Sequence, residues 1–234
     1  GKPIVGILGE LPEAMLRAFD LYPVPLSSLD GYIYRHGEAE GCDVIRSTLI
    51  YLKTQKCPIL YSSDFLLCDT SCPAMIKALE TEGKEVLIYE NPCSLMEMLR
   101  ERTGRPFSEE KYLHAKNALE DIHGYLSLLG ETDLSSKTLF EIEFFSNYIL
   151  DLDQRREFLD KVVKEVTRSS YLLKNDRKIV SVQCPGGIYD EIFRLEKEPT
   201  LLRITKDDHS HYLPRGCIYK GNRHISYKEE EINE

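Results

Sequence analysis

The sequence predicts an α/β protein built on a parallel sheet, and three observations support this class. In the first hundred residues, short apolar runs alternate with amphipathic stretches, as strands alternate with helices in a parallel sheet. Residues 94–169 show helical spacing throughout, and the strand–helix alternation returns after residue 175. We therefore expect a first α/β lobe over residues 1–93, a helical segment over 94–172, and a small second α/β lobe with an acidic tail over 173–234.

The first lobe is expected to contain four strands and three longer helices. Residues 22–26 are extended but not central in the sheet, since their two prolines cannot donate ladder hydrogen bonds. Of the strand-like segments 58–61 and 65–68, we expect only one to join the sheet. The other elements are a strand over 3–8, a helix that opens at Leu11-Pro12, a helix over 42–56, a helix capped by Ser71 through about residue 82, and a strand over 85–89.

Polar residues mark the helix starts of the middle segment. Ser94, Ser108, and either Ser135 or Ser136 are each expected to cap a helix, and Asp153 begins a fourth. The aromatic residues Phe140, Phe144 and Tyr148 recur at helical spacing and are expected in the core. The second lobe is expected to hold a strand over 178–183, a turn over 184–187, a helix over 189–197, a strand over 201–205 and a frayed acidic end at Glu229-Glu230-Glu231.

Charge and hydropathy restrict the classes of partner. The chain carries 30 basic and 39 acidic residues, a formal net charge of −9, and no basic stripe of the kind that meets nucleic-acid phosphates. No apolar run approaches the roughly 20 residues of a membrane-spanning helix. The start of the chain, Gly1-Lys2, shows no signal-peptide pattern. We expect a cytoplasmic protein that binds neither nucleic acid nor membrane.

Two short motifs have simple structural interpretations. Gly6-Ile7-Leu8-Gly9 lacks the G-x-G-x-x-G spacing of a dinucleotide site, so we interpret it as a tight strand–helix turn. Asp207-Asp208-His209-Ser210-His211 places two imidazoles beside two carboxylates, which could hold a divalent metal. A polar loop after an edge strand is the interpretation we favour for this second motif.

The seven cysteines carry the clearest indication of chemistry. Their odd number and wide spacing argue against a disulfide framework. Cys42 and Cys72 are expected at helix N-termini, where partial positive charge favours a thiolate, the ligand of iron–sulfur clusters and soft metals. The alternative is that both are small buried residues at helix starts. We interpret Cys57, Cys68 and Cys93 as structural.

Four stretches, taken in order and with their spacing, carry a resemblance to a known family. They are residues 11–26, Gly41-Cys42-Asp43-Val44-Ile45-Arg46-Ser47, the segment 64–75 with its central Thr70-Ser71-Cys72, and Thr103-Gly104-Arg105-Pro106-Phe107-Ser108-Glu109-Glu110 with Asn117. On these stretches, residues 1 to about 205 resemble the D-component family of 2-hydroxyacyl-CoA dehydratases. That family also includes benzoyl-CoA reductase subunits and double-cubane-cluster proteins.

The resemblance implies two flavodoxin-like or Rossmann-like lobes with helices between them. It also implies a [4Fe–4S] cluster held by three cysteines, and it matches Cys42 and Cys72 to two of them. No position matches the third; Cys184, at the end of the strand expected over 178–183, is our choice, with Cys217 as the alternative. The chain departs from the family at Pro73, where Asp is usual, and in its shorter second lobe.

The resemblance implies a cluster-binding subunit in the radical dehydration of a 2-hydroxyacyl-CoA thioester, a lyase reaction of anaerobic metabolism. The implied partners are a second dehydratase-type subunit, an ATP-dependent activator that supplies one electron, and an acyl-CoA ligand. We expect an oligomer, and no activity from this chain alone. The alternatives are a shortened paralogue without a cluster, acting as a binding or regulatory module, and a small-molecule-binding α/β protein that uses the cleft between its lobes.

Overall fold

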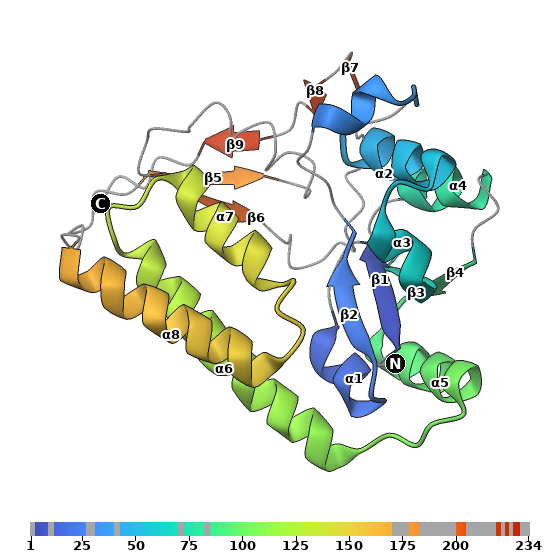
Figure 1. Ribbon diagram of the computed structural model, residues 1–234, viewed down its shortest axis with the longest axis horizontal. Helices are drawn as coiled ribbons and strands as arrows, with labels where there is room; N and C mark the ends of the chain where they lie inside the picture. The colour runs from blue at the N-terminus through green and yellow to red at the C-terminus, as the bar shows by residue number, and fades with distance from the viewer. Residues whose placement is uncertain are drawn as a thin grey trace. The chain divides into compact units, whose positions relative to one another are not determined.

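The computed structural model describes most of the first 169 residues and five short strands beyond them (Figure 1). The described ranges are 3–8, 12–26, 31–39, 43–69, 73–81, 85–169, 178–182, 200–204, 219–220, 223–224 and 227–229. The chain divides into two compact units, formed mainly by Gly1–Ala115 and by Lys116–Thr205. The lobe boundaries after residues 93 and 172 stay predictions.

A four-stranded parallel sheet organises the first unit and confirms the predicted fold class. Its strands are β1 (Ile4–Leu8), β2 (Tyr22–Pro25), β3 (Ser63–Asp69) and β4 (Val86–Tyr89), in the order β2-β1-β3-β4. All three neighbouring pairs run parallel. The proline-containing β2 lies at an edge, as expected of a strand that cannot donate a full ladder of hydrogen bonds.

Helices cover both faces of this sheet, and each face has its own core. Helices α1 (Glu13–Ala18) and α5 (Pro92–Thr103) pack on one face, and α2 (Asp43–Thr54) and α4 (Pro73–Thr81) on the other. Because successive strand residues point to opposite faces, β1 and β3 supply both cores. The α1–α5 face contains Val5, Ile7, Phe65, Leu67, Leu16, Phe19, Leu95 and Leu99, and the α2–α4 face contains Leu8, Leu66, Cys68, Ile45, Leu49, Met75 and Leu79.

Gly6 lies within β1, in agreement with the strand predicted over residues 3–8, and the turn predicted after it falls at Gly9, outside the described residues. A Cβ atom at Gly6 would lie 2.5 Å from Cδ1 of Leu26 and 2.8 Å from Cδ2 of Leu66. The strand can therefore pack closely on the α2–α4 face only while residue 6 has no side chain.

We expect Gly6→Ala to lower the free energy of unfolding by about 1–3 kcal/mol, because the added methyl group overpacks this core. Urea denaturation followed by circular dichroism measures the loss. The matched control is Gly124→Ala in the middle of α6 (Glu109–Gly130), where a Cβ would meet nothing within 4 Å. There the substitution is expected to stabilise the helix by roughly 0.5–1 kcal/mol. A Gly6→Ala midpoint equal to wild type would contradict the expected crowding.

Two local predictions in the first unit are corrected. Residues 58–61 are not a strand but part of a short helix, α3 (Pro58–Ser62), whereas the expectation that only one of the two segments joins the sheet is confirmed, since that segment is β3. The Sγ atom of Cys57 caps α3 by accepting a hydrogen bond from the amide of Leu60 at 3.4 Å. Helix α5 is capped by Asn91, and Ser94 completes the capping box, its amide donating to Asn91 Oδ1 at 2.9 Å.

Three long helices follow, and their caps agree largely with the predicted ones. They are α6, α7 (Ser136–Ser146) and α8 (Leu152–Ser169). The hydroxyl of Ser108 accepts from the amide of Lys111 at 3.3 Å, and that of Ser135 accepts from Thr138 at 3.2 Å. Helix α8 begins one residue before the predicted Asp153, because Asp151 caps it instead.

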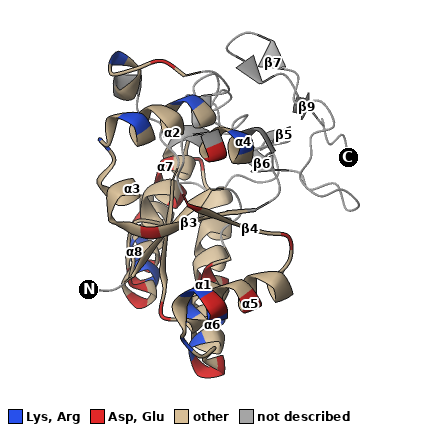
Figure 2. Cartoon of the chain, turned by 90° about the vertical axis from the view of Figure 1, so that its right-hand side faces the viewer, with Lys and Arg blue, Asp and Glu red and all other residues tan. Residues whose placement is uncertain are grey.

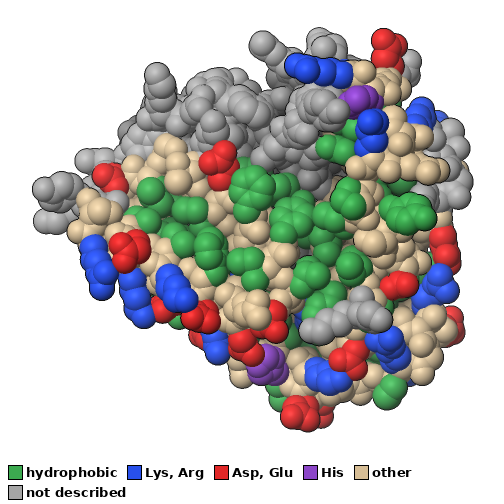
Figure 3. All heavy atoms as spheres, in the orientation of Figure 1, with side chains coloured by type: hydrophobic (Ala, Val, Ile, Leu, Met, Phe, Trp, Pro, Cys, Tyr) green, Lys and Arg blue, Asp and Glu red, His purple; other side chains and the backbone are tan. Residues whose placement is uncertain are grey.

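The aromatic residues of α7 are less buried than expected. The Phe144 ring stacks on Phe140, with centroids 5.6 Å apart, and meets Tyr148, just past the end of α7, edge-on at 5.4 Å. All three side chains are only half-buried. Their neighbour Phe145 is 60% exposed. Figure 3 shows hydrophobic side chains at the surface over α7. The prediction that these rings form the core is therefore wrong for this part of the chain.

Arg155 joins α8 to the end of α7 within the second unit. Its side chain is 1% exposed. Its Nε donates to the carbonyl of Ile149 at 3.2 Å, and its terminal nitrogens lie 3.4 Å from the carbonyl and side-chain oxygens of Asn147. Asn147 is the C-cap of α7, so the buried guanidinium lies at the negative end of that helix dipole.

A second sheet contains the predicted parallel pair. Strand β5 (Lys178–Val182) pairs in parallel with β6 (Thr200–Ile204) and antiparallel with β9 (Tyr227–Glu229). The expectation of a frayed acidic end is wrong at Glu229, which pairs with Val180. Strands β7 (Tyr219–Lys220) and β8 (Arg223–His224) form a separate antiparallel pair. The helix predicted over 189–197 lies outside the described residues.

Candidate functional site

The strand order creates a topological switch point between β1 and β3. From the carboxyl end of β1 the chain continues to α1 on one face of the sheet, and from the carboxyl end of β3 it continues to α4 on the other. In open α/β sheets, ligands bind outside the carboxyl ends of the strands at such a point. We therefore take the carboxyl edge beside Leu8 and Asp69 as the candidate site.

Two helices begin directly after the cysteines that the sequence singled out. Helix α2 begins at Asp43, the residue after Cys42, and α4 begins at Pro73, the residue after Cys72. The segment that contains Cys72 also follows β3, at the switch point. The predicted helix starts at these two points are thus confirmed.

The candidate ligands themselves lie outside the described residues. This holds for Cys42, Cys72 and Cys184, for the alternative Cys217, and for the Asp207–His211 motif. In the parts of the chain that the structure describes, no group of three or more His, Cys, Asp or Glu residues is placed to hold a metal ion. The described part also contains no helix that is both long and apolar enough to cross a membrane.

Helices α2 and α4 form one layer on the same face of the sheet. Ile45 and Leu49 of α2 share a core with Met75 and Leu79 of α4, and Figure 1 shows the two helices side by side. Each helix follows a parallel strand, so each begins at the carboxyl edge. The two helix starts that follow Cys42 and Cys72 consequently belong to the same edge of the sheet.

The remaining described cysteines differ in burial. Cys68 is 2% exposed within β3, as expected of a structural residue. Cys57 is half-buried and caps α3, so it has a structural role of a different kind. Cys93 is exposed near the start of α5, and it is therefore not a packing residue of the core.

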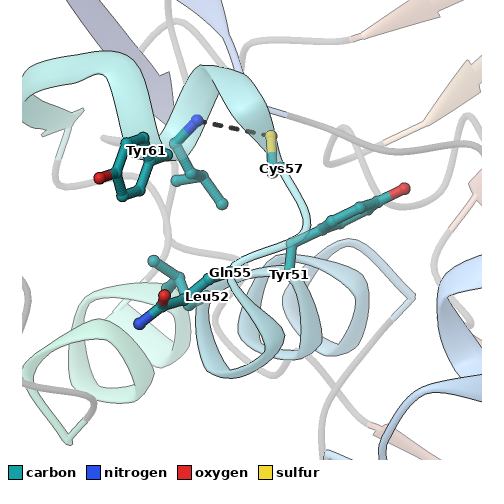
Figure 4. Close-up of a pocket in the computed structure, with 6 residues that line it drawn as sticks. Tyr51, Leu52, Gln55, Cys57 and Tyr61 are labelled. Atoms are coloured by element: carbon teal, nitrogen blue, oxygen red, sulfur yellow. Dashed lines mark hydrogen bonds between the residues drawn. The ribbon is translucent and has the colours of Figure 1, made fainter.

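A small pocket lies away from the switch point, where α2 ends and α3 begins (Figure 4). Its volume is about 130 Å³, and it is lined by Tyr51, Leu52, Gln55, Cys57, Leu60 and Tyr61. Ligand sites for drug-sized molecules occupy roughly 300–1,000 Å³. The pocket is thus too small for a large ligand, and the thiol at its wall already serves as a helix cap.

A cation–π contact joins α2 to the short helix before it. The 3₁₀-helix η1 (Gly31–Arg35) packs against α2. The guanidinium carbon of Arg46, in α2, lies over the Tyr34 ring, 4.7 Å from its centroid. Figure 2 shows basic residues on α2. Arg46 stands in the Cys42 segment quoted above, but its contact with Tyr34 depends on folding and has no signal in the sequence.

Comparison with known proteins gives one low-identity similarity. No family model matches the chain. Over 232 residues the chain is 26% identical to a curated Escherichia coli (strain K12) protein named "Putative dehydratase subunit YjiM". The alignment covers 85% of this chain and 60% of that protein, so the chain spans less than two thirds of its relative's length. At this low identity the chain is similar to a dehydratase subunit, which agrees with the general class that the sequence resemblance implies.

Proposed function

We propose that this protein is an iron–sulfur-cluster-binding subunit of a 2-hydroxyacyl-CoA dehydratase, with Cys42, Cys72 and Cys184 as the cluster ligands. The observation that carries the proposal is the placement of the starts of α2 and α4, which follow Cys42 and Cys72 at one edge of a parallel sheet. The similarity to the Escherichia coli protein supports the same class.

The donor chemistry at these helix starts fits a cluster. A helix N-terminus carries partial positive charge, which favours a thiolate over a thiol. Cysteine thiolates are the usual ligands of [4Fe–4S] clusters. The third proposed ligand, Cys184, also follows a parallel strand, since β5 ends two residues earlier at Val182.

In this proposal the chain holds the cluster and orients an acyl-CoA thioester beside it. A bound cluster with one iron open to a non-protein ligand supplies one-electron chemistry. The partial positive charge at the starts of α2 and α4 favours charged thiolates, and both helices pack on the same apolar core. A second dehydratase-type subunit and an ATP-dependent activator complete the proposed assembly, and we expect no activity from this chain alone.

The proposal predicts that the anaerobically purified protein contains iron and acid-labile sulfide. We expect about four of each per chain or per dimer, with a broad visible absorption band. Colorimetric iron and sulfide counts and an absorption spectrum check this expectation. An iron-free, colourless protein after anaerobic reconstitution would contradict it.

A shortened paralogue without a cluster is the second candidate. It is favoured by Pro73, which stands where the resembled family usually has Asp. Pro73 is the first residue of α4, a position where the missing N–H costs nothing, so it has a sufficient structural role there. Under this alternative, the iron-free outcome above is the expected one, and the chain acts as a binding or regulatory module.

A further inference from the structure

The two edges of the four-stranded sheet differ in the backbone groups that they present outward. Strand β2 forms one edge, and the amide of Tyr22 in it donates to the carbonyl of Pro3 at 2.9 Å. Because the residues of a strand alternate between its two sides, Pro23 and Pro25 face away from β1. Proline has no N–H to donate, so both outward positions of this edge are blocked against a further strand.

Strand β4 forms the other edge, at the right of the sheet in Figure 1, and contains no proline. The amide of Leu66 in β3 donates to the carbonyl of Glu85, and Leu87 of β4 therefore faces β3. By the same alternation, Val86 and Ile88 face outward. No strand pairs with β4 on that side in the part of the chain that the structure describes. Two N–H and two C=O groups are thus available to another strand.

The segment that follows β4 does not fill this place. Flavodoxin-like sheets with the strand order 2-1-3-4-5 have a fifth strand beside the fourth. Here the chain returns from α5 to α1, where the amide of Ser108 donates to the carbonyl of Ala18 at 3.0 Å. The Phe107 ring meets the Phe19 ring edge-on at 5.7 Å. Helix α6 then begins at Glu109, so the chain between β4 and α6 adds no fifth strand.

We infer that a second copy of this chain pairs with β4, strand against strand and antiparallel, about a two-fold axis. Val86 of one copy then exchanges both of its backbone hydrogen bonds with Ile88 of the other, and the symmetry repeats the exchange. This register satisfies every outward group of both strands and sets Leu87 opposite its own counterpart. The sheets of the two copies join into one continuous sheet, a form of strand addition.

The register that satisfies these backbone groups also pairs opposite charges. Glu90 follows β4 and is exposed. Counted along the sequence, the position opposite Glu90 is Lys84 of the other copy, because the two residues are equally far from Leu87. Opposite charges at facing positions favour strand pairing, and like charges oppose it. The segment is therefore complementary to itself, which a two-fold interface between identical chains requires.

Sedimentation-velocity ultracentrifugation of the full, anaerobically purified chain over a range of concentrations tests this inference. We expect a reversible equilibrium between monomer and dimer in the wild type. Lys84→Glu and Glu90→Lys each create two like-charged pairs in the dimer, and each is expected to weaken dimerisation by about tenfold. The double variant restores both pairs with their signs reversed, so its dimerisation is expected to return close to that of the wild type.

Two further variants complete the test. Lys161→Glu is the matched control, since it reverses an exposed charge on α8 in the second unit and is expected to leave dimerisation unchanged. Ile88→Pro gives β4 the block that β2 already has, and it is expected to yield a monomer with unchanged far-ultraviolet circular dichroism. The charge variants keep the test decisive if Ile88→Pro does not fold.

Three results would each overturn the inference. They are a wild type that is monomeric at every concentration, a dimer that neither charge reversal weakens, and a double variant that dimerises as weakly as the single ones. Weakening by Lys161→Glu equal to that by Lys84→Glu would also overturn it, because the effect would then not belong to the β4 edge.

This inference does not rest on the proposed function, since β4 contains none of the proposed cluster ligands. Iron and sulfide counts on the same fractions keep the two apart. An iron-free dimer that responds to the charge reversals would remove the cluster proposal and leave the inference standing. An iron-containing monomer would do the reverse.

Discussion

Replacing Cys72 by Ala is expected to abolish the iron content of the anaerobically purified protein. A three-thiolate site that loses one ligand exposes a second iron and is not expected to hold its cluster through purification. The same loss is expected for Cys42→Ala, because both cysteines directly precede helices at the switch-point edge. Iron and acid-labile sulfide per folded chain are the measured quantities.

Cys93→Ala is the matched control for this loss. Cys93 is also near the start of a helix, α5, and its side chain is exposed, so its removal should leave the fold intact. Its helix packs on the α1–α5 face, whereas α2 and α4 pack on the other. We therefore expect wild-type iron content in Cys93→Ala. Equal iron in the Cys72 and Cys93 variants would exclude Cys72 as a ligand.

Replacing Arg155 by Ala is expected to lower the free energy of unfolding by about 3 kcal/mol. The substitution removes a side chain that is 1% exposed and leaves the carbonyls of Asn147 and Ile149 without their charged donor. These acceptors are partly buried, and leaving buried acceptors unsatisfied costs roughly 1–3 kcal/mol; the cavity left by the buried Arg155 side chain adds to the cost. Urea denaturation monitored by circular dichroism gives the difference.

The adjacent Arg156 provides the comparison. Its side chain is 42% exposed and forms ion pairs with Asp121 at 3.1 Å and Asp153 at 3.2 Å. Because exposed ion pairs contribute roughly 0–1 kcal/mol, Arg156→Ala should be nearly neutral. If the two alanine variants lost the same stability, the buried contacts of Arg155 would not be the cause.

Local sequence patterns are enough to predict the elements whose stabilising contacts join residues only a few positions apart. Ser108 and Ser135 cap helices through amides three residues ahead, so the cap and its target are read together. The apolar run of residues 58–61 was ambiguous, because four such residues fit a strand or a helical turn equally. In the structure this run forms α3, whose first turn is capped by the thiol of Cys57. Because cysteine is not among the usual capping residues, the sequence gives no sign of this cap.

The burial of the aromatic side chains in the helical segment cannot be predicted from local sequence patterns. Phe140, Phe144 and Tyr148 recur at helical spacing, and the structure shows that the Phe144 ring contacts both of the other rings. Spacing does not reveal whether another element packs against that face. The rings are therefore only half-buried despite their apolar pattern.

The alternation of strands and helices, the edge position of β2 and the cysteines beside helix starts all follow from composition and spacing along the chain. The order β2-β1-β3-β4 does not, because β1 pairs with β3 across more than fifty intervening residues. That pairing creates the switch point and puts the starts of α2 and α4 at one edge. The contact of Arg46 with Tyr34 likewise exists only once η1 has packed against α2. Strand pairing and helix packing join residues distant in sequence, and so the candidate site exists only in the folded chain.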